Sequence, residues 1–156
     1  MVGKFQTGGE NIQSGSSLEE YISKIKEAVD ELSESIVVFV YGTLMSGNSN
    51  HERYLSKARF AGDVIAEGFA LYDLGSYPGI IHSENDNVKG QLYIIDSRIL
   101  RELDILEEEG SLYIKKLINV VNYKNETQQA YVYVYNHDVS GKVKVCYGNQ
   151  PWGLKI

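Results

Sequence analysis

The most informative feature of the hydrophobic pattern is an unbroken apolar run, Ile36-Val37-Val38-Phe39-Val40-Tyr41, which ends at Gly42 and Thr43. A short run rich in Val, Ile and Phe, without polar alternation, predicts a strand that is buried on both faces. Gly42 has no Cβ, so the backbone there can adopt a positive φ or approach a ligand closely. We therefore expect unpaired N–H groups where the strand ends, and such groups can form an anion-binding concavity.

Together with this run, the pattern predicts about six strands and two or three helices that do not alternate regularly. Helical periodicity covers 18–32, 51–58 and 98–108, and further strand-like stretches cover 64–72, 80–81, 88–95, 113–121 and 129–135. Gly62 and Gly68 are predicted bulges or bends. Irregular order of helices and strands predicts an α+β fold.

The stretch 129–135 indicates what kind of sheet this is. Ala130, Val132 and Val134 alternate with Tyr131, Tyr133 and Tyr135. Both sets are apolar enough to be at least partly buried, as they are in the wall of a barrel. We therefore expect a small mixed β-barrel flanked by helices.

Three regions follow from composition. Residues 1–16 are rich in Gly, Ser, Gln and Asn, which predicts a flexible N-terminal arm. Residues 17–33 form an amphipathic helical extension that starts at a capping box, Ser17 to Glu20. Residues 34–156 form a single domain. The apolar face of the helix either covers the core of its own chain or pairs with the same helix of a second copy in a homodimer.

Composition narrows the class of protein. The chain of 156 residues has a formal net charge of −6, which argues against nucleic acid or an anionic membrane as a partner. No apolar run reaches about 18 residues, so no transmembrane helix is expected. A single cysteine, Cys146, excludes an internal disulfide and favours a cytoplasmic location. The three histidines share no metal-ligand spacing, so no metal site is expected.

The acidic run Glu107-Glu108-Glu109 closes the helix predicted over 98–108. Acidic runs usually form a solvated surface. Helical phase nevertheless separates the three residues: with Ile99 at zero, the apolar stripe centres near ~30° and Glu107 falls at ~80°, whereas Glu108 and Glu109 fall at ~180° and ~280°. A carboxylate on an apolar face is costly to bury ionised, so Glu107 is the candidate general acid and base.

Four segments together resemble the gamma-glutamylcyclotransferase-like (AIG2-like) family. They are Val38-Phe39-Val40-Tyr41-Gly42-Thr43-Leu44, Gly75-Ser76-Tyr77-Pro78-Gly79, Leu103-Asp104-Ile105-Leu106-Glu107 with Tyr113, and Ala130-Tyr131-Val132-Tyr133. The resemblance implies a small mixed barrel in which backbone groups of Tyr41, Gly42, Thr43 and Leu44 line the substrate pocket. It implies that Glu107 is the catalytic residue.

The resemblance also implies a reaction. A γ-glutamyl amide, a small molecule, would be cleaved by its own α-amine, which releases 5-oxoproline and an amine or amino acid without a cofactor. Tyr113 and Tyr135 are further candidates for the pocket, with core packing as their alternative role. The alternative function is a non-catalytic module of the same fold that binds a small molecule.

Overall fold

The computed structural model describes residues 14–33 and 35–153. The chain divides into two compact units, Met1–Ser35 and Ile36–Ile156. Residues 1–13 of the predicted N-terminal arm lie outside the described residues.

The first unit contains helix α1 (Ser14–Ser33). The prediction that the helix begins at Ser17 was wrong, because residues 14–16 are already helical. The apolar periodicity starts only at Leu18 and so marks the first residue of the apolar face, not the first turn of the backbone. The side chains of Leu18, Tyr21, Ile22 and Ile25 are between 44% and 63% exposed.

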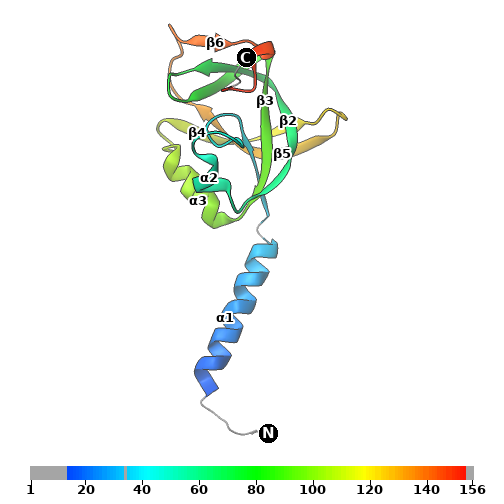
Figure 1. The fold of residues 1–156 in the computed structure, drawn as a ribbon, viewed down its shortest axis with the longest axis vertical. Helices are drawn as coiled ribbons and strands as arrows, with labels where there is room; N and C mark the ends of the chain where they lie inside the picture. Colours follow the sequence, from blue (N-terminus) through cyan, green and yellow to red (C-terminus); the bar gives the residue numbers. More distant parts are fainter. Residues whose placement is uncertain (1–13, 34, 154–156) are drawn as a thin grey trace. The chain divides into compact units, whose positions relative to one another are not determined.

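The second unit is built on a closed mixed barrel (Figure 1). Its strands are β1 (Ile36–Val40), β2 (Arg59–Asp73), β3 (Pro78–Ile95), β4 (Tyr113–Val121) and β5 (Thr127–Tyr135). They pair in the order β3-β1-β5-β4-β2, and pairing of β2 with β3 closes the circle. β1 runs parallel to β5, and the other pairs are antiparallel. The predicted α+β fold with a small mixed barrel is confirmed.

β1 separates two hydrophobic clusters, which explains its unbroken apolar sequence. Phe39, and Tyr41 directly after the end of the strand, belong to the cluster inside the barrel. Val38 and Val40 belong to a second cluster, which also contains Leu55 of α2 (His51–Leu55) and Leu103 of α3 (Ser97–Leu106). Successive side chains of a strand point to opposite faces. The prediction of a strand buried on both sides is confirmed.

Several boundaries differ from the prediction. The stretches around 80 and 88–95 belong to one long strand, β3, and α2 is shorter than the predicted 51–58. α3 ends at Leu106, because Glu108 has a φ of 49° and cannot continue a right-handed helix. The predicted irregularities at Gly62 and Gly68 are confirmed by register shifts between β2 and β3.

Two short elements follow β5 near the C-terminal end of the described residues. β6 (Val143–Val145) pairs with β2 outside the closed circle, and the 3₁₀-helix η2 (Tyr147–Asn149) follows it. No helix in the described part of the chain is long and apolar enough to cross a membrane.

Candidate active site

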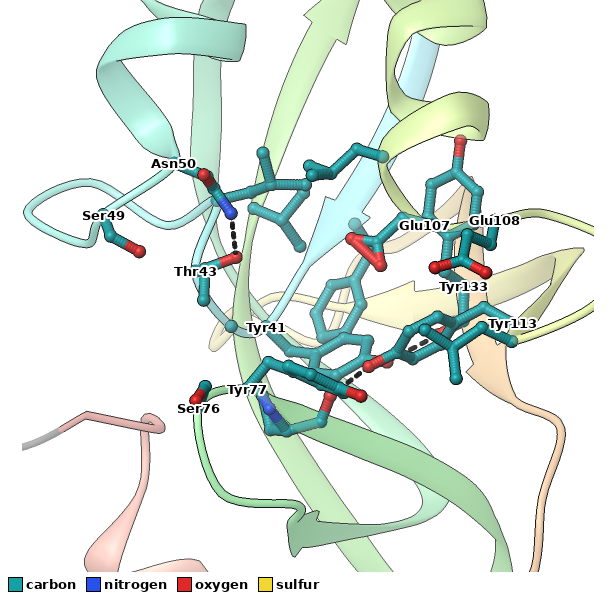
Figure 2. A pocket seen from close by; sticks show the side chains of 17 residues that line it. Tyr41, Thr43, Ser49, Asn50, Ser76, Tyr77, Glu107, Glu108, Tyr113 and Tyr133 are labelled. Atoms are coloured by element: carbon teal, nitrogen blue, oxygen red, sulfur yellow. Dashed lines mark hydrogen bonds between the residues drawn. The ribbon is translucent and has the colours of Figure 1, made fainter.

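A cavity of about 380 Å³ opens where several segments of the barrel unit meet. They are the end of β1, the loop that follows it, the turn before β3, the C-terminal end of α3, the start of β4 and the last part of β5 (Figure 2). The lining includes Tyr41, Gly42, Thr43 and Leu44, together with Glu107 and Tyr113. The structure thus brings together six of the seven residues that the sequence singled out.

Glu107 reaches the cavity because it is the C-cap residue of α3. Its φ of −86° and ψ of 0° are still right-handed, and its N–H donates to the carbonyl of Leu103 at 2.9 Å, so the helical phase continues through it. Glu107 is half-buried, whereas Glu108 and Glu109 are exposed. The side chain of Glu109 accepts a 3.1 Å hydrogen bond from the N–H of Lys115.

The environment of the Glu107 carboxyl favours its neutral form. Burial raises its pKa from the ordinary 4.5 to about 7. Among the described residues, none donates a hydrogen bond to this carboxyl, and no cation pairs with it. A carboxyl with a pKa near neutrality can both accept and return a proton at physiological pH.

The first residues of the loop after β1 have backbone N–H groups that are unpaired among the described residues. Asn48 Nδ2 donates to the carbonyl of Gly42 at 2.9 Å, and the backbone N–H of Asn50 donates to that of Thr43 at 2.9 Å. These bonds hold the loop through its carbonyl oxygens. Within the described residues, the N–H groups of Gly42, Thr43 and Leu44 have no hydrogen-bond acceptor. Free N–H groups beside a cavity are suited to binding an anion or a developing oxyanion.

Gly42 is required here by a close contact. A Cβ at this position would lie 2.7 Å from Cγ of Pro78. Gly42 is not among the residues with positive φ. The loop after β1 and the start of β3 therefore approach each other so closely that only glycine fits.

Two tyrosine hydroxyls tie the walls of the cavity together. Tyr41 donates to the carbonyl of Tyr133 at 2.6 Å, and Tyr113 donates to the carbonyl of Pro78 at 2.6 Å. Burial is the largest cause that raises the pKa of both hydroxyls well above their ordinary value. Both tyrosines thus remain protonated donors. Tyr135 is not in the lining; its ring packs against that of Tyr113 with a centroid distance of 5.6 Å.

Sequence reasoning missed part of the lining: Ser49, Asn50, Ser76, Tyr77, Glu108 and Tyr133. Most of these are polar loop residues, which carry no periodic signal. Tyr133 was assigned only to a strand face. Among the described residues, no group of three or more His, Cys, Asp or Glu side chains is arranged to hold a metal ion.

A closed mixed barrel, with a carboxyl of raised pKa and free N–H groups around one cavity, has the features of a small-molecule binding or active site. The chain belongs to the family described as "Gamma-glutamyl cyclotransferase, AIG2-like", whose model matches residues 38–153. The predicted family is therefore confirmed.

Individual relatives agree with this assignment. The chain is 36% identical to the gamma-glutamylcyclotransferase family protein YtfP of Escherichia coli, over 67% of this chain and 86% of that protein. It is 33% identical to the gamma-L-glutamyl-butirosin B gamma-glutamyl cyclotransferase of Niallia circulans, over 65% of this chain and 67% of that protein. The crystal structure of a mouse AIG2-like protein superposes with a TM-score of 0.60 at 29% identity, and covers 65% of this chain and 77% of the mouse chain.

Proposed function

We propose that this protein cleaves a γ-glutamyl amide by ring closure and releases 5-oxoproline and an amine. The observation that carries the proposal is the half-buried Glu107 carboxyl, with a pKa of about 7, in the same cavity as the free N–H groups of the loop after β1. Family membership supports the same chemistry.

The reaction joins two parts of one substrate molecule. The α-nitrogen attacks the γ-carbonyl carbon, a five-membered lactam forms, and the amide C–N bond breaks. Well-oriented intramolecular attack is worth about 7–11 kcal/mol, so the proposed step needs neither an enzyme nucleophile nor a cofactor. The protein has to fold the glutamyl chain and to move protons.

Glu107 is the proposed proton carrier. Its ionised form takes a proton from the α-ammonium, which frees the lone pair for attack. The protonated form then donates to the departing nitrogen. Each proton that the attacking nitrogen loses is gained by the leaving amine, so the carboxylate is regenerated.

The N–H groups of Gly42, Thr43 and Leu44 are the proposed anion site. They would hold either the α-carboxylate of the glutamyl group or the oxyanion that develops on the γ-carbonyl. Tyr113 would act as a wall of the cavity, since its hydroxyl is already used by the carbonyl of Pro78.

The test is a panel of γ-glutamyl dipeptides and γ-glutamyl amines incubated with the purified protein, with 5-oxoproline as the readout. We expect turnover of at least one member and a loss of 10²-fold or more in Glu107→Gln, which keeps the size of the side chain but removes the base. Glu109→Gln is the matched control, because that carboxylate already accepts a hydrogen bond from Lys115 N–H and does not line the cavity. Undiminished activity in Glu107→Gln would contradict the proposal.

A further inference from the structure

The cavity contains a second carboxylate that the proposed ring closure does not use. Glu108 lines the same cavity as Glu107, and Figure 2 shows both side chains at the end of α3 beside Tyr113 and Tyr133. Glu108 is exposed. Within the described part of the chain, its carboxylate forms no hydrogen bond and no ion pair.

Among the described residues that line the cavity, no cationic side chain accompanies these two carboxyl groups. The 17 residues that line the cavity include no Lys, Arg or His. Lys115 of β4, whose backbone N–H donates to the Glu109 carboxylate, has its Nζ 2.9 Å from Oδ2 of Asp104 and so is already paired. The cavity is thus negative on its side-chain lining, and its only proposed anion site is made of neutral backbone N–H groups.

This charge distribution discriminates between leaving amines. One carboxylate, that of the glutamyl group, can be held by the backbone N–H groups. A leaving amine with its own carboxylate would bring another anion beside Glu108, and none of the described residues that line the cavity is a cation that could receive it. A second ammonium group on the leaving amine could instead pair with the Glu108 carboxylate, which has no other partner among the described residues.

Resting on the function proposed above, we propose that the preferred substrate is the γ-glutamyl amide of a diamine or polycationic amine, and that Glu108 binds the remote positive charge of the leaving group. Glu107 keeps its role at the reacting nitrogen. Glu108 acts on specificity and takes no part in proton transfer.

The experiment compares three substrates of similar length: the mono-γ-glutamyl amides of 1,4-diaminobutane, of butylamine and of 4-aminobutanoate. Their leaving groups are cationic, neutral and anionic. We expect kcat/KM to fall in that order, with an advantage of the cationic over the neutral leaving group of up to about fivefold, the upper end for an exposed charge pair. The advantage should shrink as the salt concentration rises.

Glu108→Gln is the decisive variant. It should bring the kcat/KM values of the diaminobutane and butylamine amides to within about twofold of each other, with the larger loss on the diaminobutane amide. Glu109→Gln should keep the discrimination. Equal kcat/KM for all three amides, or an equal loss on all three in Glu108→Gln, would overturn the inference while 5-oxoproline release still supported the reaction. No 5-oxoproline from any of the three, or from the wider panel, would instead overturn the proposed function and this inference with it.

Discussion

The hydroxyl of Tyr133 donates a 2.6 Å hydrogen bond to Oδ1 of Asp104. The same carboxylate accepts two hydrogen bonds from Nζ of Lys115, at 3.1 and 2.9 Å. One side chain of α3 is thereby joined to both β4 and β5. Since Glu107 follows Asp104 by three residues at the end of α3, we infer that this junction helps to fix where the Glu107 carboxyl lies. This inference accounts for the spacing of Asp104 and Glu107 in the Leu-Asp-x-x-Glu motif.

Tyr133→Phe tests this junction. The variant removes a hydrogen bond to an ionised group and should lower the free energy of unfolding by about 1.5–3 kcal/mol. We expect kcat to fall by about tenfold or more with a smaller change in KM, because a slightly displaced proton carrier is costly to the chemical step. Denaturant unfolding and steady-state kinetics measure the two effects. Tyr123→Phe, at an 87% exposed tyrosine, is the control and should change neither.

The pH dependence of activity should follow Glu107. Its ionised form is the proposed base, so kcat/KM should rise with pH and reach half its plateau near pH 7, where burial places the pKa of this carboxyl. Initial rates between about pH 5 and 9 would show it. A half-plateau near the ordinary value of 4.5 would contradict the role of burial.

Stability should show the opposite trend with pH. The pKa of Glu107 is raised in the folded protein, so the folded state binds more protons than the unfolded state between about pH 4.5 and 7. Its stabilising contribution is complete below pH 4.5 and is lost as the pH rises through 7. At pH 8, Glu107→Gln should therefore unfold at a higher denaturant concentration than the unmodified protein. We expect its free energy of unfolding to be higher by on the order of 1–2 kcal/mol, after allowance for the partial solvent contact of this side chain. At pH 4 the difference in the free energy of unfolding should nearly vanish. Glu84→Gln, at an exposed glutamate, is the control and should show no such dependence on pH.

Much of this arrangement could be predicted from the sequence because it depends on local periodicity. The apolar run of β1 required two buried faces, and the strand at 113–121 was predicted with the observed bounds. Helical phase selected Glu107 because that residue is the last with helical φ and ψ; the same phase does not apply to Glu108, which has left the helix.

Other relationships could not be predicted, because they join residues far apart in the chain. Nothing local indicates that Tyr133 reaches Asp104 or that the hydroxyl of Tyr113 reaches the carbonyl of Pro78. The reason for Gly42 was also left open. Positive φ and approach to a ligand were both considered, and the structure instead shows the ring of Pro78 against the glycine.

Gly42→Ala should therefore damage the cavity. Its added methyl group would lie 2.7 and 2.8 Å from two ring carbons of Pro78, and these backbone segments have to separate to admit it. We expect a loss of about 1–3 kcal/mol in the free energy of unfolding and reduced release of 5-oxoproline. Gly148→Ala is a matched control, because a Cβ there meets nothing within 4 Å. Equal behaviour of the two variants would contradict the packing argument.

The homodimer through α1 stays a prediction, and the spacing of its apolar residues strengthens it. Leu18, Ile22, Ile25, Val29 and Leu32 follow one another at intervals of four, three, four and three residues. This is the a and d pattern of a coiled coil, with β-branched Ile22 and Val29 at the a positions, as two-stranded parallel coils favour. A seam of little more than two heptads should give only a weak dimer, which dissociates on dilution.

Sedimentation of the full chain over a range of concentrations measures this. Ile25→Glu places a charge in the seam and should give the monomer mass at every concentration. Lys24→Glu introduces the same residue type off the apolar stripe and should retain the dimer. If the unmodified chain and Ile25→Glu have the same mass throughout, the apolar face of α1 does not pair with a second copy. Activity of the Ile25→Glu monomer then tests whether the two units are functionally separate. The described residues that line the cavity all belong to the barrel unit, so turnover should continue in the monomer.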